Sequence, residues 1–155
     1  MAEKLSFVTF KISSELYGIN IMEVREVIQL CEITPIPNAP DFVDGVINLR
    51  GEIIPILNLS KRFHFKEKSY TEEEELLRSI LVIKVNDLVI GIIIDQINKV
   101  VNIYEDQIQS PPQMISGIGA EFVQGVVRLE EEDILLIILN EKKLFNKDEM
   151  LKMSK

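Results

Sequence analysis

The sequence contains no tryptophan, one cysteine and one histidine among its 155 residues. With His64 as the only histidine and Cys31 as the only thiol, the chain is too poor in both to assemble the nucleophile and base that covalent catalysis uses. We therefore expect no catalytic residues and no cofactor. A single cysteine cannot build a disulfide framework either, so Cys31 is expected to be a buried or half-buried thiol in a cytoplasmic protein.

Long hydrophobic runs are also missing. The longest are 88–94 and 134–139, far short of the roughly 20 residues that a membrane-spanning helix needs. The N-terminal MAEKLSFVTFKIS lacks the apolar core of an export signal. Basic residues are too few, because 17 Lys and Arg stand against 25 Asp and Glu, for a net charge of -8. This balance argues against nucleic acid and anionic membranes as partners, and favours a basic or apolar protein.

What the sequence does contain is a repeat of strand-like segments. Ile, Val and Leu dominate the 46% of residues that are hydrophobic, and this β-branched bias favours strands. FVDGVINL at 42–49 matches FVQGVVRL at 122–129, with Phe, Val, Gly, Val and Leu identical. Such self-similarity indicates an internal duplication. Three further pairs of segments match in the same order: 52–57 with 133–138, 8–28 with 81–101, and 33–37 with 108–112.

Each copy has room for four or five short strands. That is too little for a β-sandwich but enough for a small closed barrel. We predict a mainly β protein of two packed barrels, the first over 6–66 and the second over 80–140. The expected strands are 6–12, 16–21, 45–50 and 53–59 in the first copy, and 80–86, 88–94, 124–129 and 134–139 in the second.

Two segments lie outside the barrels in this single domain of residues 1–155. EKSYTEEEELLRS at 67–79 is expected to be an acidic linker, solvated and mobile. EKKLFNKDEMLKM at 141–153 places apolar residues among charges, which predicts a short C-terminal helix and tail over 141–155 that lie on the barrels.

Several segments resemble those of a known family. YGINIMEVREVI, ITPIPNAPDFVDGVINLRGEIIPILNL followed by RF, and VIGIIIDQINKVV resemble CheW, the coupling protein of bacterial and archaeal chemotaxis. The resemblance covers nearly the whole chain, and PNAPDFVDGVINLRG is its most specific part. Two positions depart from it, because Asn58 and Ser60 stand where the family usually has Asp and Arg.

The resemblance implies two five-stranded barrels of the Src-homology-3 type, related by pseudo-twofold symmetry. It implies a non-enzymatic adaptor that couples the cytoplasmic tips of chemoreceptors, the methyl-accepting chemotaxis proteins, to the regulatory domain of the histidine kinase CheA. Other CheW copies in rings are a further implied partner. The protein would then be cytoplasmic and associated with membrane-bound receptor arrays through protein partners, without inserting into the membrane.

Arg50 is the residue that most needs an explanation, because it ends an apolar strand. From the sequence alone, a guanidinium that reaches into water is the simpler interpretation. The resemblance implies instead that the Arg of NLRG lies near the groove between the barrels and affects receptor coupling. A half-buried guanidinium needs a carboxylate, and we predict that Glu26 is its partner.

Val24, Val27 and Ile28 follow the i, i+3, i+4 spacing of an amphipathic turn, and Ile97, Val100 and Val101 repeat it in the second copy. Such a stripe is more often core than interface. Receptor tips are helical hairpins, so the resemblance implies a helix in a groove with these residues as walls. We expect about half of the six to face a partner and half the core.

Other candidates lie around the first copy's last hairpin. Gly45, Gly51 and Asn48 join the receptor-binding set, although turn chemistry alone accounts for the glycines. Ile33, Ile36 and Pro37 are candidates for the kinase contact or for the rim of the groove, with a stiff inter-barrel loop as an equal alternative. The full receptor-binding set is Val24, Glu26, Val27, Ile28, Gly45, Asn48, Arg50, Gly51, Val100 and Val101.

The remaining polar motifs predict no chemistry. Glu130–Asp133 lacks the alternating ligands and central glycine of a calcium loop, so we expect a solvated hairpin tip and no metal. SGIGAE at 116–121 lacks the third glycine of a dinucleotide-binding loop. Asp95 follows an apolar strand and is expected to cap a turn.

The predicted function is therefore that of a chemotaxis adaptor. A CheW-like regulatory module of a related kinase system that does not serve chemotaxis is the close alternative. A small β-barrel enzyme or ligand-binding protein is a more distant one, because no catalytic constellation is present.

Overall fold

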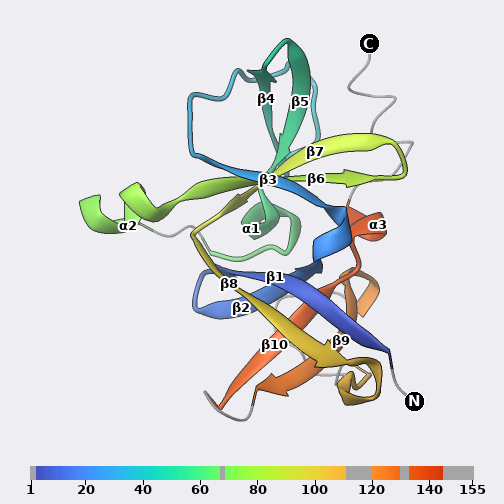
Figure 1. Ribbon diagram of the computed structural model, residues 1–155. Helices are drawn as coiled ribbons and strands as arrows, with labels where there is room; N and C mark the ends of the chain where they lie inside the picture. Colours follow the sequence, from blue (N-terminus) through green and yellow to red (C-terminus); the bar gives the residue numbers. More distant parts are fainter. Residues whose placement is uncertain (1–2, 67–68, 111–119, 130–132, 145–155) are drawn as a thin grey trace.

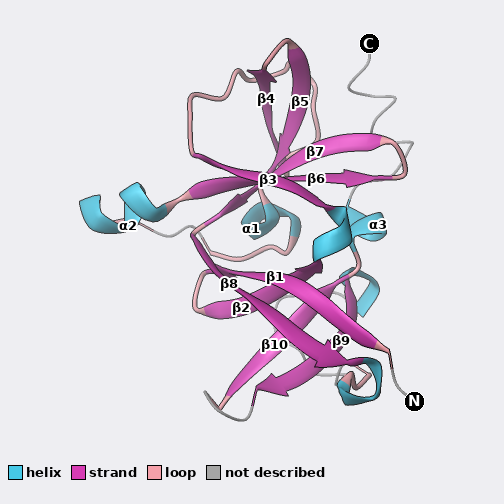
Figure 2. Cartoon of the chain, viewed as in Figure 1, coloured by secondary structure: helices cyan, strands magenta, loops and turns pink. Residues whose placement is uncertain are grey.

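The computed structural model describes residues 3–66, 69–110, 120–129 and 133–144. Strands dominate these residues and form two bodies, one above the other in the view of Figures 1 and 2. The strands are β1 Lys4–Ile12, β2 Glu15–Asn20, β3 Val24–Gln29, β4 Val43–Leu49, β5 Glu52–Leu57, β6 Ser79–Val85, β7 Leu88–Ile94, β8 Gln96–Tyr104, β9 Val123–Leu129 and β10 Ile134–Leu139. The helices are α1 Leu59–Arg62, α2 Glu72–Leu77 and α3 Glu141–Leu144, with short 3-10 turns η1 Ile21–Glu23, η2 Glu105–Gln107 and η3 Ala120–Phe122.

The strands form two five-stranded sheets, as the mainly β prediction requires. The order is β8-β1-β2-β10-β9 in the first sheet and β3-β6-β7-β5-β4 in the second. If each strand of one copy is replaced by its counterpart in the other, the first order becomes the second. The internal duplication is therefore a property of the fold as well as of the sequence.

The sheets do not coincide with the barrels expected at 6–66 and 80–140. The second sheet is continuous in sequence from β3 to β7, while the first is built from β1 and β2 together with β8, β9 and β10. The reason is an exchange between the copies. The β6–β7 hairpin returns beside β5, and β2 pairs in parallel with β10, so each sheet takes strands from both copies. Parallel pairing needs a long connection, which the segment through α1 and α2 provides for β5 and β7.

Equivalent hydrogen bonds mark the two copies. The backbone N–H of Asn58 donates to the carbonyl of Phe42 at 2.7 Å, and that of Asn140 donates to Phe122 at 2.9 Å. The donor and the acceptor lie farther apart in sequence in the second copy than in the first. The reason is that the connection between β9 and β10 is two residues longer than the connection between β4 and β5. The β4–β5 connection is the pair Arg50 and Gly51, whereas residues 130–133 separate β9 from β10.

Gly45 and Gly125 show why the copies share a glycine. In the first copy, Thr34 exchanges two 2.9 Å backbone hydrogen bonds with Val46, and a Cβ on Gly45 would collide with the Thr34 carbonyl. In the second copy, Gln109 makes the same exchange, and a Cβ on Gly125 would lie 2.9 Å from its carbonyl oxygen. Both glycines are needed because a loop crosses directly over the strand.

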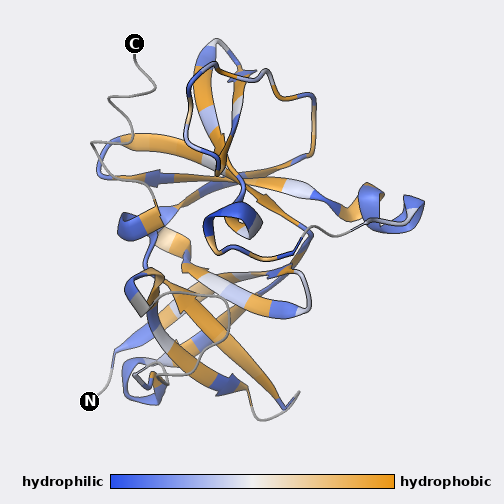
Figure 3. Ribbon diagram, turned by 180° about the vertical axis from the view of Figure 1, so that it is seen from behind, coloured by the Kyte–Doolittle hydropathy of each residue, from blue (hydrophilic) through white to orange (hydrophobic). Residues whose placement is uncertain are grey.

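The largest core cluster lies between the two sheets and takes residues from both, including Phe10, Tyr17, Leu81 and Ile92. Smaller clusters fill the interior of each sheet. Figure 3 shows the hydrophobic colouring concentrated on the strands. Arg62 of α1 stacks within this region, with its guanidinium carbon 4.0 Å from the Phe42 ring centre and 4.9 Å from that of Phe122. One cation therefore contacts the equivalent phenylalanine of each copy.

Two local expectations need correction, and a third can be followed only in part. Residues 22–28 do not form an amphipathic turn, because η1 ends at Glu23 and β3 follows directly. The expected linker at 67–79 contains α2, whose first turn is closed by a capping box between Thr71 and Glu74. The expected C-terminal helix begins as α3, and its continuation over 145–155 lies outside the described residues. Within the described part of the chain, no helix is long and apolar enough to cross a membrane.

Candidate interaction surfaces

The β4–β5 hairpin explains why an arginine and a glycine follow an apolar strand. Arg50 and Gly51 both have positive φ, 51° and 87°, which matches the two-residue turn that suits the twist of a hairpin. The Gly51 N–H donates to the Asn48 side chain at 2.9 Å and closes the turn. Asn86 and Asp87 have positive φ in the β6–β7 turn too, so this backbone conformation belongs to the hairpin turn and does not by itself indicate a function.

Arg50 pairs with Glu26, as predicted, and the pair is joined by a second one. The Arg50 guanidinium donates to the Glu26 carboxylate, and Arg25 lies 3.2 Å from Glu52. Both pairs begin on β3, an edge strand of its sheet, and connect it to the β4–β5 hairpin: Glu26 to the turn residue Arg50, and Arg25 to Glu52 at the start of β5. Arg50 is more exposed than expected, because 67% of its side chain is accessible compared with 26% for Glu26.

The ion pair shifts the pKa of both partners. The hydrogen bond from Arg50 lowers the pKa of Glu26, and the same bond raises the pKa of Arg50. Both groups are thus charged at neutral pH. Because the pair is exposed, its effect on the free energy of unfolding is small, and its geometry matters more than its strength.

The six residues of the apolar stripe divide evenly. Val24, Ile28 and Val101 are partly buried against the core clusters. Val27, Ile97 and Val100 are exposed, with accessible fractions of 41%, 36% and 48%. The stripe is therefore half core and half surface, as the sequence suggested, although it lies on strands.

The register of the edge strands shows where the exposed half points. Val27 lies opposite Leu81, and Val100 lies opposite Val8. Directly opposite residues share a face of the sheet, and both Leu81 and Val8 belong to the core between the sheets. Val27 and Val100 therefore lie at the exposed border of the core between the sheets. A partner that binds there can extend this core with apolar side chains of its own.

The other predicted site residues take different positions. Asn48 and Gly51 are exposed at the hairpin tip, and a Cβ on Gly51 would contact nothing within 4 Å. Gly45 is buried beneath Thr34, which does not suit close approach of a partner's backbone there. The kinase candidates lie in the loop that crosses β4, where Ile33 packs on the core, Ile36 is partly buried and Pro37 is exposed.

Several exposed apolar residues were missed, and Met22 and Ile53 are two of them. Met22 is 85% exposed in η1, and Ile53 is 61% exposed in β5 beside the Arg50 tip. The apolar run IIPIL suggests a strand that is buried throughout, but its side chains alternate between the two faces of the sheet. Ile54 and Ile56 are fully buried, so Ile53 must point to the opposite face.

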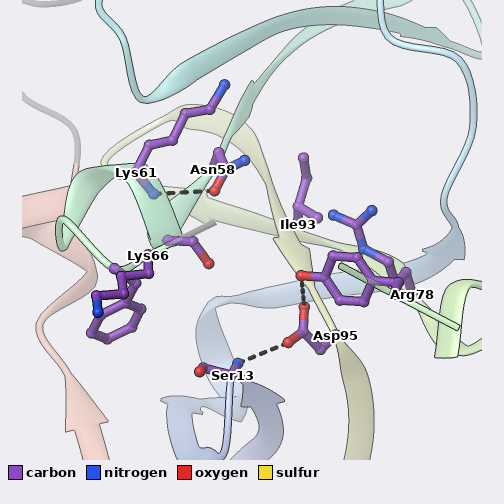
Figure 4. Close-up of a pocket in the computed structure, with 10 residues that line it drawn as sticks. Ser13, Asn58, Lys61, Lys66, Arg78, Ile93 and Asp95 are labelled. Carbon is purple, nitrogen blue, oxygen red and sulfur yellow. Dashed lines mark hydrogen bonds between the residues drawn. The ribbon is translucent and has the colours of Figure 1, made fainter. Parts of the chain in front are cut away.

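A polar cleft of about 210 Å³ lies between the sheets and the segment before α2 (Figure 4). Asp95 accepts hydrogen bonds from the Ser13 N–H at 2.7 Å and from the Tyr70 hydroxyl at 2.8 Å. Asp95 therefore caps a turn, although this is the distant β1–β2 turn at Ser13 rather than the turn after its own strand. Burial and the bond to Asp95 raise the pKa of Tyr70 to about 12, so the phenol stays protonated as a donor.

No group of three or more His, Cys, Asp or Glu suited to a metal ion occurs among the described residues. Cys31 is exposed, contrary to the expected burial. Asp133 accepts a hydrogen bond from Arg128 at 2.8 Å. Most of Glu130–Asp133 and of SGIGAE lies outside the described residues.

Comparison with known proteins connects this geometry to a family. A family model described as the CheW-like domain matches residues 6–149. The chain belongs to the CheW family. It is 45% identical over 152 residues to the chemotaxis protein CheW of Treponema pallidum, covering 98% of this chain and 88% of that protein. The chemotaxis protein CheW of Klebsiella aerogenes is 33% identical over 144 residues, which cover 93% of this chain and 83% of the relative.

A solved structure supports the same conclusion for the fold. The scaffolding protein TtCheW from Thermoanaerobacter tengcongensis superposes with a TM-score of 0.83 at 32% sequence identity. The superposition covers 96% of this chain and 92% of that one. The CheW-like fold implied by the resemblance is thereby confirmed, including two five-stranded sheets.

Proposed function

We propose that this protein is a non-enzymatic chemotaxis adaptor that couples the cytoplasmic tips of chemoreceptors to the histidine kinase CheA. The observation that carries the proposal is the match to CheW proteins over nearly the whole chain, together with the CheW-like fold. The relatives described above are named chemotaxis proteins, which favours this function over a regulatory module of another kinase system.

The receptor surface is proposed at the border of the core between the sheets. Val27 and Val100 present apolar area on the edge strands, and exposed apolar groups at such a border favour a partner with its own apolar stripe. A helical hairpin tip supplies one at helical spacing. Burial of these side chains would provide most of the affinity.

Arg50 and Glu26 are proposed to set the orientation of the receptor. The pair connects the hairpin tip to β3, the strand that carries Val27 and Ile28. A partner that contacts both strands therefore meets them in a fixed relation. Asn48 and Gly51 shape the same tip through their hydrogen bond, whereas Gly45 contributes indirectly by admitting the crossing loop.

The kinase contact is proposed on a separate surface, at the loop with Ile33, Ile36 and Pro37. This loop is attached to β4 by the two bonds between Thr34 and Val46, so it is a firm platform for the CheA regulatory domain. Two separate surfaces allow the adaptor to hold both partners at once. Association with membrane-bound receptor arrays, and with further CheW copies in rings, would then follow from protein contacts alone.

Co-sedimentation tests this function directly. The protein should form a ternary complex with receptor fragments and CheA of its own organism, and kinase activity should rise when all three are present. If neither partner sediments with the protein, the adaptor function is wrong. If CheA binds but receptors do not, the regulatory module of another kinase system becomes the better description.

A further inference from the structure

Helix α2 is an exposed arm that the proposed coupling surfaces do not use. It projects to one side of the two sheets (Figure 1). Its last two residues are leucines, and Leu76 is 72% exposed while Leu77 is 49% exposed. The acidic first turn suits the positive end of the helix dipole and needs no ligand. The helix dipole does not account for the exposure of the two leucines.

The arm is firmly attached at its base. Arg78 follows the helix, lies 3.2 Å from Glu75, and stacks its guanidinium carbon 4.2 Å from the Tyr70 ring centre. Tyr70 in turn donates to Asp95, which holds Ser13 at the β1–β2 turn (Figure 4). This chain of contacts joins both ends of α2 to the body, so the leucines are presented at a defined place.

The four consecutive glutamates of α2 have different tasks. Glu74 closes the capping box with Thr71, and Glu75 pairs with Arg78. Within the described part of the chain, no hydrogen bond or ion pair engages Glu72 or Glu73. Helical spacing places each free carboxylate one turn before a leucine, Glu72 before Leu76 and Glu73 before Leu77.

A cleft of about 310 Å³ opens beside this arm. Leu77 and Glu74 form one wall, and Lys11, Ser14 and Gln96 belong to the other side. The arm therefore offers an apolar pair, two open carboxylates and an adjacent hollow that can receive a side chain. The outward groups of the arm are apolar or negative, because α2 itself contains only glutamates and leucines, and Arg78, which follows it, has only 17% of its side chain exposed.

We propose that α2 is a docking site for a basic amphipathic helix of a protein partner, separate from the receptor and kinase surfaces. Leucines of the partner would cover Leu76 and Leu77, and its lysines or arginines would pair with Glu72 and Glu73. A second copy of this chain is a poor occupant, because its net charge of -8 would repel an acidic arm. The proposal stands independently of chemotaxis coupling.

The test uses the full chain and a fluorescent synthetic peptide that folds as a helix with one leucine face and one lysine face. Binding followed by anisotropy should weaken by roughly tenfold or more in the double variant Leu76→Gln/Leu77→Gln, which keeps helix propensity. Glu72→Gln/Glu73→Gln should weaken binding several-fold, and should also reduce its dependence on salt.

Two matched controls decide the outcome. Ile53→Gln removes an equally exposed apolar side chain on β5, and Glu105→Gln/Asp106→Asn removes two exposed charges on η2. Both should bind the peptide like the unmodified protein. Equal losses in arm and control variants would mean nonspecific attraction and would overturn the proposal. Sedimentation showing a dimer that the leucine variant dissociates would identify a second copy as the occupant, and would overturn it too.

Discussion

The two copies of the repeat share a framework and differ at their tips. Both have the crossing loop over a buried glycine, and both have a bulge where the edge strand meets its neighbour, in β3 and in β8. At the tip, Arg50 reaches across to Glu26 on the opposite edge strand, whereas Arg128 pairs with Asp133 inside its own hairpin. The shared parts maintain the fold, and the parts that differ are where a partner can distinguish one end of the molecule from the other.

The largest expected effect comes from the shared glycines. Gly45→Ala should lower the free energy of unfolding by about 3 kcal/mol, because a Cβ collides with the Thr34 carbonyl and φ is 146°. Gly125→Ala should cost less, because the carbonyl oxygen that its Cβ would meet, that of Gln109, is 2.9 Å away, which is farther than the Thr34 carbonyl oxygen would be from a Cβ on Gly45. In addition, Gly125 does not share the positive φ of Gly45. Urea denaturation of both variants measures the difference. A larger loss for Gly125→Ala would mean that the two crossing loops are not equivalent.

The bulge also explains what the sequence could not tell. Val24 and Val27 share a face although they lie three residues apart, since the extra residue at Arg25 shifts the strand alternation by one. Ile97 and Val100 repeat this spacing. A strand with one bulge therefore imitates the period of a helix, and the amphipathic turn was predicted for that reason.

Features that depend on residues close together in the sequence could be predicted more easily than features that depend on distant residues. The duplication, the hairpins and the Arg50–Glu26 pair follow from short motifs and charge pairing. The exchange of strands does not, because apolar alternation reports that a strand is half buried and says nothing of which strand lies beside it. The helix at 72–77 was not predicted but could have been, because Thr71 and Glu74 have the spacing of a capping box.

The next largest effect should appear at the exposed apolar border. Val27→Ser and Val100→Ser should each weaken receptor binding by roughly tenfold, because each removes apolar area that a partner buries. Isothermal titration with a receptor fragment measures this for each edge strand separately. Loss in only one variant would show that the receptor contacts one strand, and the proposed two-walled surface would be wrong.

A smaller effect is expected at the differing tips. Arg50→Ala should weaken receptor binding a few-fold and leave kinase binding unchanged, because it frees the hairpin tip from β3. Arg128→Ala is the matched control, because it removes an exposed arginine paired with Asp133 in the other copy. Pull-down with receptor fragments and with CheA measures both. Equal effects of the two variants would remove the functional distinction between the tips.

The smallest effect concerns a position where the copies differ in burial. Glu141 begins α3 where the first copy has Leu59, which is fully buried at the start of α1. Burial raises the pKa of Glu141 from 4.5, and the nearby Glu23 raises it further. A carboxyl group with a raised pKa in the folded state binds its proton more tightly there than in the unfolded chain. The contribution of Glu141 to the free energy of unfolding therefore falls as pH rises above about 4.5.

Glu141→Gln replaces the carboxyl with a neutral amide and so removes this loss of stability at higher pH. The variant should be more stable than the unmodified protein at neutral pH, by less than about 1 kcal/mol because the carboxyl is only partly buried. As the pH falls below 4.5, the Glu141 carboxyl becomes protonated in both the folded and the unfolded chain, and the difference should shrink towards zero. Thermal unfolding from pH 4 to pH 8 measures it, with Glu121→Gln as the exposed control on η3. A constant difference across this range would show that Glu141 affects stability through packing rather than charge.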